Sequence, residues 1–313
     1  MSDLVTTLKR IVVGTRISPL ALAQTEEFAR RVKELYPDLE LSTVPITTDG
    51  DRHKDSPLLS MGRGMFVKEI ELALLNGEID VAVHSAKDLP SFMPDGLSIA
   101  AFPERQDPRD VIVNKWNLPL MELPPGARLG TSSPRRTAQI KAVRPDVEIL
   151  PIRGNVGTRM DKAKSGDYDG VVLAAAGLVR LGRQDEISEY LSTDICTPDV
   201  GQGALAIQAR ADNAEVIEIM SSVDHAPTSI ALRCERAFLS TLGGGCKVPV
   251  AAYAELRGDV LRIEAMAALP DGSSMIRKRL TYDAGDPELA GKRVAEALID
   301  AGAKNFITED EAV

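Results

Sequence analysis

Cysteine and histidine are scarce in this sequence, with three residues of each among 313. Cys196, Cys234 and Cys246 form no Cys-x-x-Cys pair, and the histidines lie too far apart for any cluster with zinc-ligand spacing. An odd number of cysteines also leaves at least one thiol outside any disulfide scheme. We therefore expect no protein metal site, and we expect a reducing compartment, the cytoplasm.

The chain also lacks long hydrophobic runs and an excess of positive charge. Its longest apolar candidate, residues 170–179, is shorter than the roughly 18 residues that a membrane-spanning helix needs. The first ten residues lack the charged-then-apolar order of a signal peptide. A net charge of −9 argues against nonspecific binding to nucleic acid. These features predict a protein without membrane or nucleic-acid partners.

Nucleotide-binding motifs are absent or incomplete. The sequence contains no Gly-x-x-x-x-Gly-Lys-Ser/Thr segment. Residues 201–206 match a relaxed dinucleotide fingerprint, but residues 204–209 have the pattern of a strand where that motif requires a helix. We therefore reject a nucleotide site at this position.

What the chain does contain is a repeated alternation of short apolar strands and helical patterns. The first lobe is predicted to hold strands at 11–14, 39–46, 79–84 and 97–102, with helices at 19–35 and around 66–74. A second lobe repeats the pattern, with strands at 127–130, 147–152 and 171–175 and helices at 134–143, 156–164 and 184–191. Such alternation predicts an α/β fold with helices on both faces of a parallel or mixed sheet. Proline in the joins at 104–110 and 197–203 is typical of hinges.

The last third of the chain has a different pattern. Helical patterns occupy residues 213–220 and 228–239. Apolar residues then alternate strictly between turns at 258–259 and 270–272, which predicts a three-stranded antiparallel meander over 250–281 with one buried face. A closing helix is predicted near 294–301. We expect this segment to be a smaller α/β domain, because 313 residues fit two or three domains.

One cysteine stands in a glycine-rich turn. Glycines at 243–245 precede Cys246, and their lack of side chains leaves room for the thiol to carry a bulky group. Lys247 places a cation beside the sulfur, which favours the reactive thiolate. The alternative is a small buried cysteine after a glycine that ends a helix. The local residues alone favour neither interpretation.

The predicted third strand ends at a polar segment that contains Lys87 and Asp88. In open α/β sheets, ligands bind beyond the carboxyl ends of the strands, which places Asp88 to meet a ligand and Lys87 to bind an anionic group. Pro90 keeps the chain from continuing as a helix. The alternative is that Asp88 only caps a turn, and its position does not separate the two.

A basic segment interrupts the acidic chain. Residues 128–183 hold eleven Lys and Arg against five Asp and Glu, which favours an internal site for a small anion over a nucleic-acid surface. The predicted helix at 134 begins after three hydroxyl residues, and its free N–H groups would form an anion cradle. Asn155 is a plausible N-cap of the next helix. The alternative is an ordinary solvated surface.

Several arginines follow predicted strands, and this shared placement is the informative feature. They are Arg16, Arg135, Arg136, Arg153 and Arg180. Guanidinium groups can grip carboxylates with two parallel hydrogen bonds. A ligand with several carboxylates would account for the common placement, whereas separate surface salt bridges would account for any single arginine only.

Seven segments in order resemble the porphobilinogen deaminase family, also called hydroxymethylbilane synthases, along nearly the whole chain. They are residues 14–21, 66–69, 84–90, 130–133, 153–159, 200–204 and 244–249. The resemblance implies two lobes like those of type II periplasmic binding proteins, joined by hinges, and a third α/β domain with the three-stranded sheet. The implied boundaries are 1–104 with 204–221 returning, 109–198, and 222–313 with the cofactor cysteine.

The resemblance also implies a reaction. Cys246 is implied to hold, through a thioether, a dipyrromethane cofactor that the enzyme assembles itself and keeps as a primer. Four porphobilinogen molecules are added in turn with loss of ammonia, and hydrolysis releases hydroxymethylbilane, a linear tetrapyrrole of porphyrin and heme biosynthesis. The expected protein is thus a cytoplasmic transferase, a monomer, whose small-molecule partner is porphobilinogen.

Roles for individual residues follow from the same resemblance. Asp88 is implied to be catalytic, because it would bind pyrrole N–H groups, stabilise the positive charge that develops as ammonia leaves, and assist proton transfer. The residues implied to bind cofactor or substrate are Arg16, Ser18, Arg63, Phe66, Lys87, Thr131, Ser132, Ser133, Arg135, Arg136, Arg153, Asn155, Arg159, Arg180 and Gln202. Arg63 stands where many relatives have lysine, and Pro134 stands where leucine is common.

Two other functions fit parts of the sequence. A non-catalytic two-lobed binding protein for a small polycarboxylate would share the fold, because fold does not determine function. An unmodified Cys246 in the purified protein would indicate that alternative. A cysteine hydrolase would need a histidine base, for which His84 and His225 are the reasonable candidates, and neither lies in a pairing motif.

Overall fold

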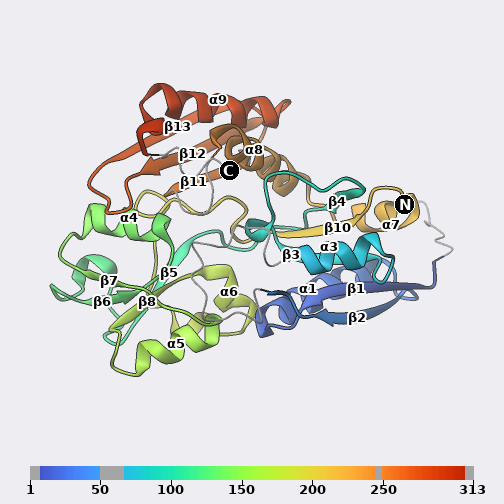
Figure 1. The fold of residues 1–313 in the computed structure, drawn as a ribbon, viewed down its shortest axis with the longest axis horizontal. Coiled ribbons are helices and arrows are strands. Elements are labelled where there is room, and N and C mark those ends of the chain that lie inside the picture. The colour runs from blue at the N-terminus through green and yellow to red at the C-terminus, as the bar shows by residue number, and fades with distance from the viewer. Residues whose placement is uncertain (1–7, 50–66, 244–248, 307–313) are drawn as a thin grey trace. The chain divides into compact units, whose positions relative to one another are not determined.

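The computed structural model describes residues 8–49, 67–243 and 249–306, which form two compact units (Figure 1). The described part of the first unit comprises residues 8–49, 67–105 and 204–229, so the chain leaves this unit once and returns to it. The second unit comprises residues 106–203, 230–243 and 249–306. It holds both a five-stranded and a three-stranded sheet, while the first unit holds one five-stranded sheet.

The sheet of the first unit has the strand order β2-β1-β3-β10-β4. Its strands are β1 (Arg10–Arg16), β2 (Glu40–Ile46), β3 (Val81–Ser85), β4 (Leu97–Ala101) and β10 (Leu205–Arg210). β1 pairs in parallel with β2 and β3, whereas β10 runs antiparallel to both β3 and β4. Because β10 is a strand, the rejection of the dinucleotide fingerprint at 201–206 is confirmed.

Helices cover both faces of this sheet. They are α1 (Pro19–Leu35), α3 (Lys68–Leu75) and α7 (Ala214–Ser221). Phe28 of α1 and Met220 of α7 are fully buried in one apolar cluster with strand residues. Ile70 of α3 belongs to a separate cluster with Ala82 of β3, whose side chain lies on the other face of the sheet from those of its neighbours. Each large buried apolar side chain contributes about 1.5–3 kcal/mol to folding, so these clusters hold β1 and β3 against the helices.

The five-stranded sheet of the second unit has the order β7-β6-β8-β5-β9. Its strands are β5 (Asp110–Asn114), β6 (Arg128–Gly130), β7 (Glu148–Leu150), β8 (Gly170–Ala174) and β9 (Glu189–Tyr190), and its helices are α4 (Pro134–Val143), α5 (Val156–Lys164) and α6 (Ala175–Arg180). Ile140 of α4 packs in one cluster, and Met160 of α5 packs with Leu178 of α6 in another.

The two five-stranded sheets share one topology. In the first sheet, β1 lies between β2 and β3 and is parallel to both. In the second sheet, β6 lies between β7 and β8 and is parallel to both. In the first sheet, β10 lies between β3 and the edge strand β4 and is antiparallel to both. In the second sheet, β5 lies in the same way between β8 and the edge strand β9. Both β10 and β5 come shortly after the chain has passed from one unit to the other. The prediction of two similarly built α/β lobes is therefore confirmed.

One predicted helix is wrong. Residues 184–191 form a short 3₁₀ turn, η5 (Gln184–Glu186), followed by the edge strand β9. Leu191 and Ser188 donate backbone N–H bonds to β5, and Leu191 is fully buried. The sequence interpretation missed both β5 and α6, and without β5 the segment had no visible partner strand.

The meander at the C-terminal end is confirmed. β11 (Val250–Arg257), β12 (Val260–Ala268) and β13 (Met275–Asp283) form an antiparallel sheet. One face packs against α8 (Ala226–Leu242) and α9 (Pro287–Asp300) around Phe238 and Val294, both fully buried. Gly291 lies so close to α8 that an added Cβ would come within 2.1 Å of the Cys234 carbonyl oxygen. The two helices therefore need glycine at this crossing.

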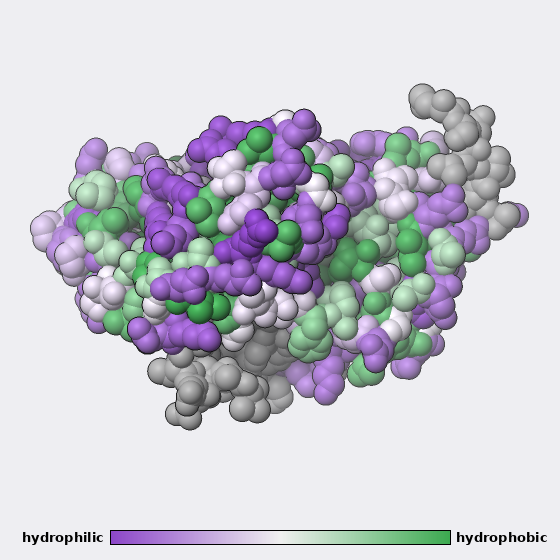
Figure 2. Space-filling view, turned by 90° about the horizontal axis from the view of Figure 1, so that it is seen from above, coloured by the Kyte–Doolittle hydropathy of each residue, from purple (hydrophilic) through white to green (hydrophobic). Residues whose placement is uncertain are grey.

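The surface is mixed in character. On the face shown in Figure 2, hydrophobic residues are scattered among hydrophilic ones. Phe92, with 71% of its surface exposed, is the most exposed of the large apolar residues among the described ranges. None of the helices in those ranges has the length and apolar character needed to cross a bilayer.

Candidate active site

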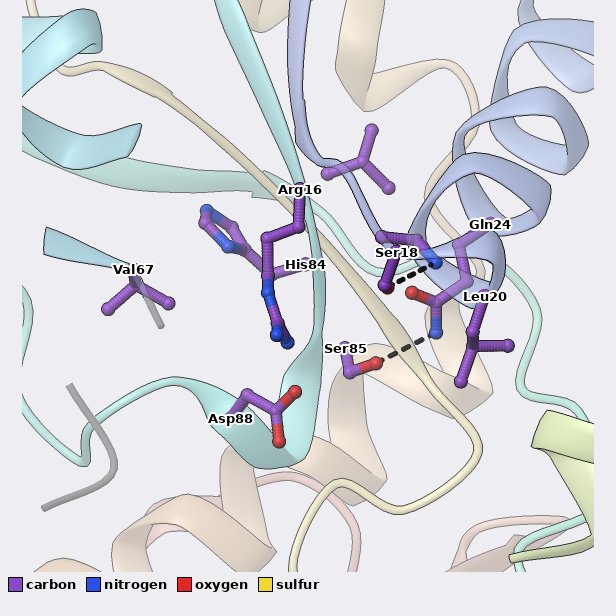
Figure 3. Close-up of a pocket in the computed structure, with 10 residues that line it drawn as sticks. Arg16, Ser18, Leu20, Gln24, Val67, His84, Ser85 and Asp88 are labelled. Carbon is purple, nitrogen blue, oxygen red and sulfur yellow. Dashed lines mark hydrogen bonds between the residues drawn. The ribbon is translucent and has the colours of Figure 1, made fainter. Parts of the chain in front are cut away.

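A pocket of about 60 Å³ opens at the carboxyl ends of β1 and β3 in the first unit (Figure 3). Arg16 is the last residue of β1, and Ser85 is the last residue of β3. The polar side chains that line the pocket are Arg16, Ser18, Gln24, His84, Ser85 and Asp88. Their convergence at strand ends follows from the sheet, because parallel strands bring their carboxyl ends to one edge.

Asp88 stands at the end of a short 3₁₀ turn, η3 (Ala86–Asp88), directly after β3. Leu89 closes this turn by donating its N–H to the Ala86 carbonyl at 3.3 Å, and it is almost completely buried. Asp88 itself is half-buried and lines the pocket. Figure 3 shows the side chain of Arg16 extending toward the Asp88 carboxylate. The pocket thus presents one acid and one guanidinium to a ligand.

The start of α1 forms another wall of the pocket. Ser18 is the N-cap, and its hydroxyl oxygen accepts a hydrogen bond from the Ala21 N–H at 3.2 Å. Pro19 has no N–H and Leu22 donates to the Ser18 carbonyl, so Leu20 supplies the free N–H of this turn, and the partial positive charge of the helix start favours an anionic ligand. Gln24, one turn further on, donates its side-chain N–H to the Ser85 hydroxyl at 2.7 Å and so ties α1 to the end of β3.

Three predicted arginines gather in the second unit. Burial lowers the pKa of Arg159 to about 10, and the positive charges of Arg136 and Arg153 act in the same direction. Arg159 is held in place by its Nε, which donates to the Gly154 carbonyl at 2.7 Å. In the described part of the chain, neither Arg153 nor Arg159 forms an ion pair with an acidic side chain. Such like-charge crowding is unfavourable until an anion binds.

Arg135 occupies a different environment, a buried ion pair with Asp110. The Nη1 of Arg135 donates to Asp110 Oδ2 and to the Thr197 carbonyl, both at 2.7 Å. Arg136 also pairs with Asp110, through its Nε at 2.9 Å. Burial alone would raise the pKa of Asp110, but attraction to the two arginines outweighs burial and holds its pKa well below the usual value. Asp110 therefore fixes both guanidinium groups.

The predicted polar supports lie around these arginines. Ser133 is the N-cap of α4 and Asn155 is the N-cap of α5, so the prediction for Asn155 as a cap is confirmed. Ser132 donates its hydroxyl to the Ile152 carbonyl at 2.7 Å. Thr131 is buried, and its hydroxyl oxygen accepts the Ser133 N–H at 3.2 Å. These bonds connect the end of β6 to the segment that follows β7.

Two further predicted residues lie at the second join. Gln202 is buried and donates to Asp110 Oδ1 at 3.0 Å and to the Pro108 carbonyl at 2.7 Å. Arg180, the last residue of α6, donates to the Gly203 carbonyl at 3.1 Å. Gly203 has φ of +89°, and an added Cβ would lie 2.4 Å from the Gln106 carbonyl oxygen. The two joins therefore run against each other, and glycine is required at this contact.

Some predicted site residues lie outside the described residues. They are Arg63, Phe66 and Cys246. Lys87 is described and half-buried, next to Asp88 on η3. The other two cysteines, Cys196 and Cys234, are fully buried. Burial raises the pKa of the Cys196 thiol to about 12, so this thiol is not an activated nucleophile.

The sequence interpretation missed three polar residues that position candidate site residues, each within its own unit. Asp110 is the first residue of β5, directly before its apolar residues. An acidic residue at the start of a buried strand is the sequence feature that could have indicated a buried ion pair. Gln24 lies inside α1, and no sequence feature distinguishes it from the other polar residues of that helix. Gln208, fully buried in β10, binds a ring nitrogen of His84 at 2.9 Å. No local pattern connects Gln208 with His84, because 124 residues separate them.

Two family models match most of the chain. The family model described as "Porphobilinogen deaminase, dipyromethane cofactor binding domain" matches residues 11–218, and the model "Porphobilinogen deaminase, C-terminal domain" matches residues 229–300. Among solved structures, the chain is similar to the periplasmic aliphatic sulphonate binding protein SsuA from Escherichia coli, with 15% identity, a TM-score of 0.41, and coverage of 75% of this chain and 71% of that one.

Similar full-length proteins carry one name. The porphobilinogen deaminase of Geobacillus kaustophilus is 48% identical over 96% of this chain and 97% of its own length. Those of Carboxydothermus hydrogenoformans and Bacillus subtilis are 44% and 45% identical, each over 96% of this chain and over 97% and 96% of their own lengths. On this similarity and on the two matching family models, the chain belongs to the porphobilinogen deaminase family.

Proposed function

We propose that Asp88, the arginines of the second unit and Cys246 carry out the reaction of this family in this chain. As a hydroxymethylbilane synthase, the chain is a transferase that joins four porphobilinogen molecules with loss of ammonia and releases hydroxymethylbilane by hydrolysis. The dipyrromethane group supplies the primer to which these units are added. The alternative of a non-catalytic polycarboxylate-binding protein is not favoured, because the similar full-length proteins are named as deaminases.

The cluster of Arg136, Arg153 and Arg159 is the observation that carries the binding part of this proposal. Each pyrrole unit bears an acetate and a propionate, so the primer and the growing chain present many carboxylates. Arg153 and Arg159 have no acidic partner among the described residues, and Arg136 shares one carboxylate with Arg135. Charge-assisted bonds to carboxylates would relieve their mutual repulsion. The residues present therefore fit a polyanionic cofactor.

Asp88 is proposed to act on the reacting unit. When ammonia leaves the aminomethyl group, positive charge develops on the pyrrole, and an ionised carboxylate close to it lowers the energy of that state. Asp88 has a carboxylate in the pocket, at the end of a turn that Leu89 anchors in the core. The same carboxylate can accept pyrrole N–H bonds and the proton that the attacked carbon releases.

Arg159→Gln tests the arginine cluster. We expect kcat/KM for porphobilinogen to fall roughly 10- to 100-fold, because a hydrogen bond to a charged group contributes about 1.5–3 kcal/mol. Stability should stay the same or rise, since one of three mutually repelling charges is removed. The readouts are steady-state kinetics and chemical denaturation, with Arg262→Gln on the exposed surface of β12 as the control. Equal losses in the two variants would contradict the role of the cluster.

Cys246→Ser tests the anchor. The intact mass of the purified wild-type protein should exceed the mass of the bare chain by that of a dipyrrole, and the variant should lack this addition, because a serine hydroxyl is far less ionised than a cysteine thiol. Cys234→Ala is the matched control, since Cys234 is fully buried in α8 and should leave the added mass in place. A dipyrrole found on Cys196 or Cys234 by peptide mapping would refute the assignment to Cys246.

The same proposal includes a cytoplasmic location and a monomeric state. The odd number of cysteines and the full burial of the reduced thiols of Cys196 and Cys234 support a reducing compartment. Light scattering of the purified holoenzyme should give the mass of one 33.7 kDa chain plus cofactor. A mass of two chains across a wide concentration range would contradict the monomer.

A further inference from the structure

A buried polar chain lies behind the Asp88 pocket, between the sheet and α3. The Nε2 of His84 on β3 lies 2.9 Å from the Oε1 of Gln208 on β10. The Nε2 of Gln208 donates to the Oε1 of Glu71 on α3 at 3.0 Å. His84 and Gln208 are 4% and 0% exposed. These three side chains therefore connect the pocket wall to the helix behind it.

The chain of bonds fixes which ring nitrogen of His84 carries the proton. Burial raises the pKa of Glu71 and the bond from Gln208 opposes that shift, and it is the amide N–H₂ group of Gln208 that faces the Glu71 Oε1. The amide oxygen of Gln208 then faces His84 and requires a donor. That donor is Nε2–H. A neutral ring with Nε2 protonated has a bare Nδ1, which is a hydrogen-bond acceptor.

The charge of the ring supports the same arrangement. Burial lowers the pKa of His84 to about 4, the bond to Gln208 opposes this shift, and the positive charge of Arg16 adds to it. The ring is therefore neutral at neutral pH. A protonated ring would place a buried cation near the half-buried Arg16, which is unfavourable in a poorly solvated wall.

Nδ1 of His84 is left with no partner. Within residues 8–49, 67–243 and 249–306, the hydrogen bond of this ring is the one made by Nε2. Nδ1 is also not among the polar side-chain atoms that are sealed from solvent without a partner. Among the described residues, this nitrogen is therefore available to a ligand in the pocket that His84 lines. His84 is one of the residues that line the pocket, and Figure 3 shows its ring on the Val67 side of Arg16, at the wall of the pocket away from the Asp88 carboxylate.

We propose that Nδ1 of His84 is a hydrogen-bond acceptor for the ligand in the Asp88 pocket, where it binds a neutral N–H donor of the pyrrole type. This inference rests on the proposed function, because the donor is then a pyrrole N–H of porphobilinogen or of the growing chain. Arg16 disfavours a cationic donor such as the aminomethyl ammonium, because both would carry positive charge beside the ring. Gln208 and Glu71 act as positioning residues that select the tautomer.

Two substitutions at His84 separate binding from support of the fold. Glutamine can place an amide N–H where Nε2 lies, so His84→Gln keeps the bond to Gln208 and loses the acceptor. Asparagine can place an amide oxygen where Nδ1 lies, so His84→Asn keeps the acceptor and loses that bond. We expect His84→Gln to raise KM for porphobilinogen roughly 3- to 10-fold, and His84→Asn to raise it less while it loses more stability in chemical denaturation.

A purely structural role predicts a different result, because the variant that loses more stability would then also lose more affinity. His84→Gln with the KM of the wild type would overturn the proposal. Steady-state kinetics and denaturation of both holoenzyme variants provide the comparison. Because the two readouts are expected to rank the variants in opposite order, a loss of folding in one variant does not conceal the outcome.

Nitrogen NMR of ¹⁵N-histidine holoenzyme gives a direct readout. The chain has three histidines, and the spectrum of His84→Gln identifies the His84 signals. We expect a protonated Nε2 and a bare Nδ1 in the free holoenzyme, and a shift of the Nδ1 signal when porphobilinogen is added in excess. A protonated Nδ1, or a signal that does not move, would overturn the proposal. Failure of the wild type to form hydroxymethylbilane would instead overturn the proposed function, and the tautomer would still be measured.

Discussion

Replacing Asp88 with asparagine is expected to lower kcat by about 10²- to 10³-fold, the loss typical of removing one preorganised group that stabilises transition-state charge. Asparagine keeps the size and the hydrogen-bonding oxygen of the side chain but removes its negative charge. Asp88 is half-buried in a short turn, and Leu89 rather than Asp88 anchors that turn in the core. The fold should therefore tolerate the change.

Single-turnover measurement of porphobilinogen consumption by the holoenzyme tests this expectation, because it separates the chemical step from product release. Asp38→Asn is the matched control, since Asp38 is an exposed aspartate of the same unit, in the turn between α1 and β2. Thermal unfolding of both variants should match the wild type. A near-normal rate in Asp88→Asn would show that the carboxylate charge is not needed at this position.

The position of Asp88 is also the clearest case of what the sequence can predict. A buried strand followed by a polar turn places the first residues of that turn at the sheet edge, and the structure has β3 ending at Ser85 with Asp88 in the next turn. The same local logic predicts Ser133 and Asn155, since N-caps are set by a few neighbouring residues. Local signals therefore locate the strand ends and the helix starts of the site.

Local sequence signals do not predict the role of each arginine. Arg135 and Arg136 are adjacent in the sequence and were predicted to act alike. In the structure, Arg135 gives its terminal nitrogens to Asp110, Thr197 and Gln202, while Arg136 also contributes to the field that lowers the pKa of Arg159. The difference depends on contacts between residues 25 to 67 positions apart, which no local pattern encodes.

The edge strand β9 shows a second limit. Residues 184–191 have an apolar spacing that favours a helix, but β9 pairs with β5 through Val111 and Ile112, and that pairing decides the structure. Similarly, the bonding of His84 to Gln208 exists because antiparallel pairing places Ala206 opposite His84 and Gln208 opposite Ala82, on the same face. Long-range strand register is the information that the sequence interpretation lacked.

Asp110→Asn is expected to destabilise the protein by about 3–5 kcal/mol, the usual cost of leaving buried charges without a partner. Asp110 is fully buried, and its carboxylate binds Arg135 at 2.7 Å and Arg136 at 2.8 Å. Asparagine offers one neutral acceptor to two buried guanidinium groups. Adding Arg135→Met to this variant should restore part of the lost stability, because it removes one of the unpaired charges and fills the space with an apolar side chain.

The control for this effect is Asp146→Asn. Asp146 is exposed, and its partner Arg144 also donates to the Leu120 and Leu123 carbonyls, so denaturation in urea should show a much smaller change for this variant. If Asp110→Asn were no more destabilising than Asp146→Asn, the carboxylate of Asp110 would not be what stabilises the two buried arginines.

The pH dependence gives Asp110 a signature of its own. The pKa of Asp110 lies below its usual value in the folded protein, because the pull of the two arginines outweighs burial. The stability that its charge contributes is therefore complete above the pKa of an unfolded aspartate, about 4, and is lost as the pH falls below that value toward the folded pKa. The stability difference between wild type and Asp110→Asn should be constant near neutral pH and shrink below about pH 4. Urea denaturation of both proteins across this pH range measures the stability difference. If the difference grew on acidification, Asp110 would bind its proton more readily in the folded chain than in the unfolded one. That is the reverse of what two neighbouring cations impose on an aspartate.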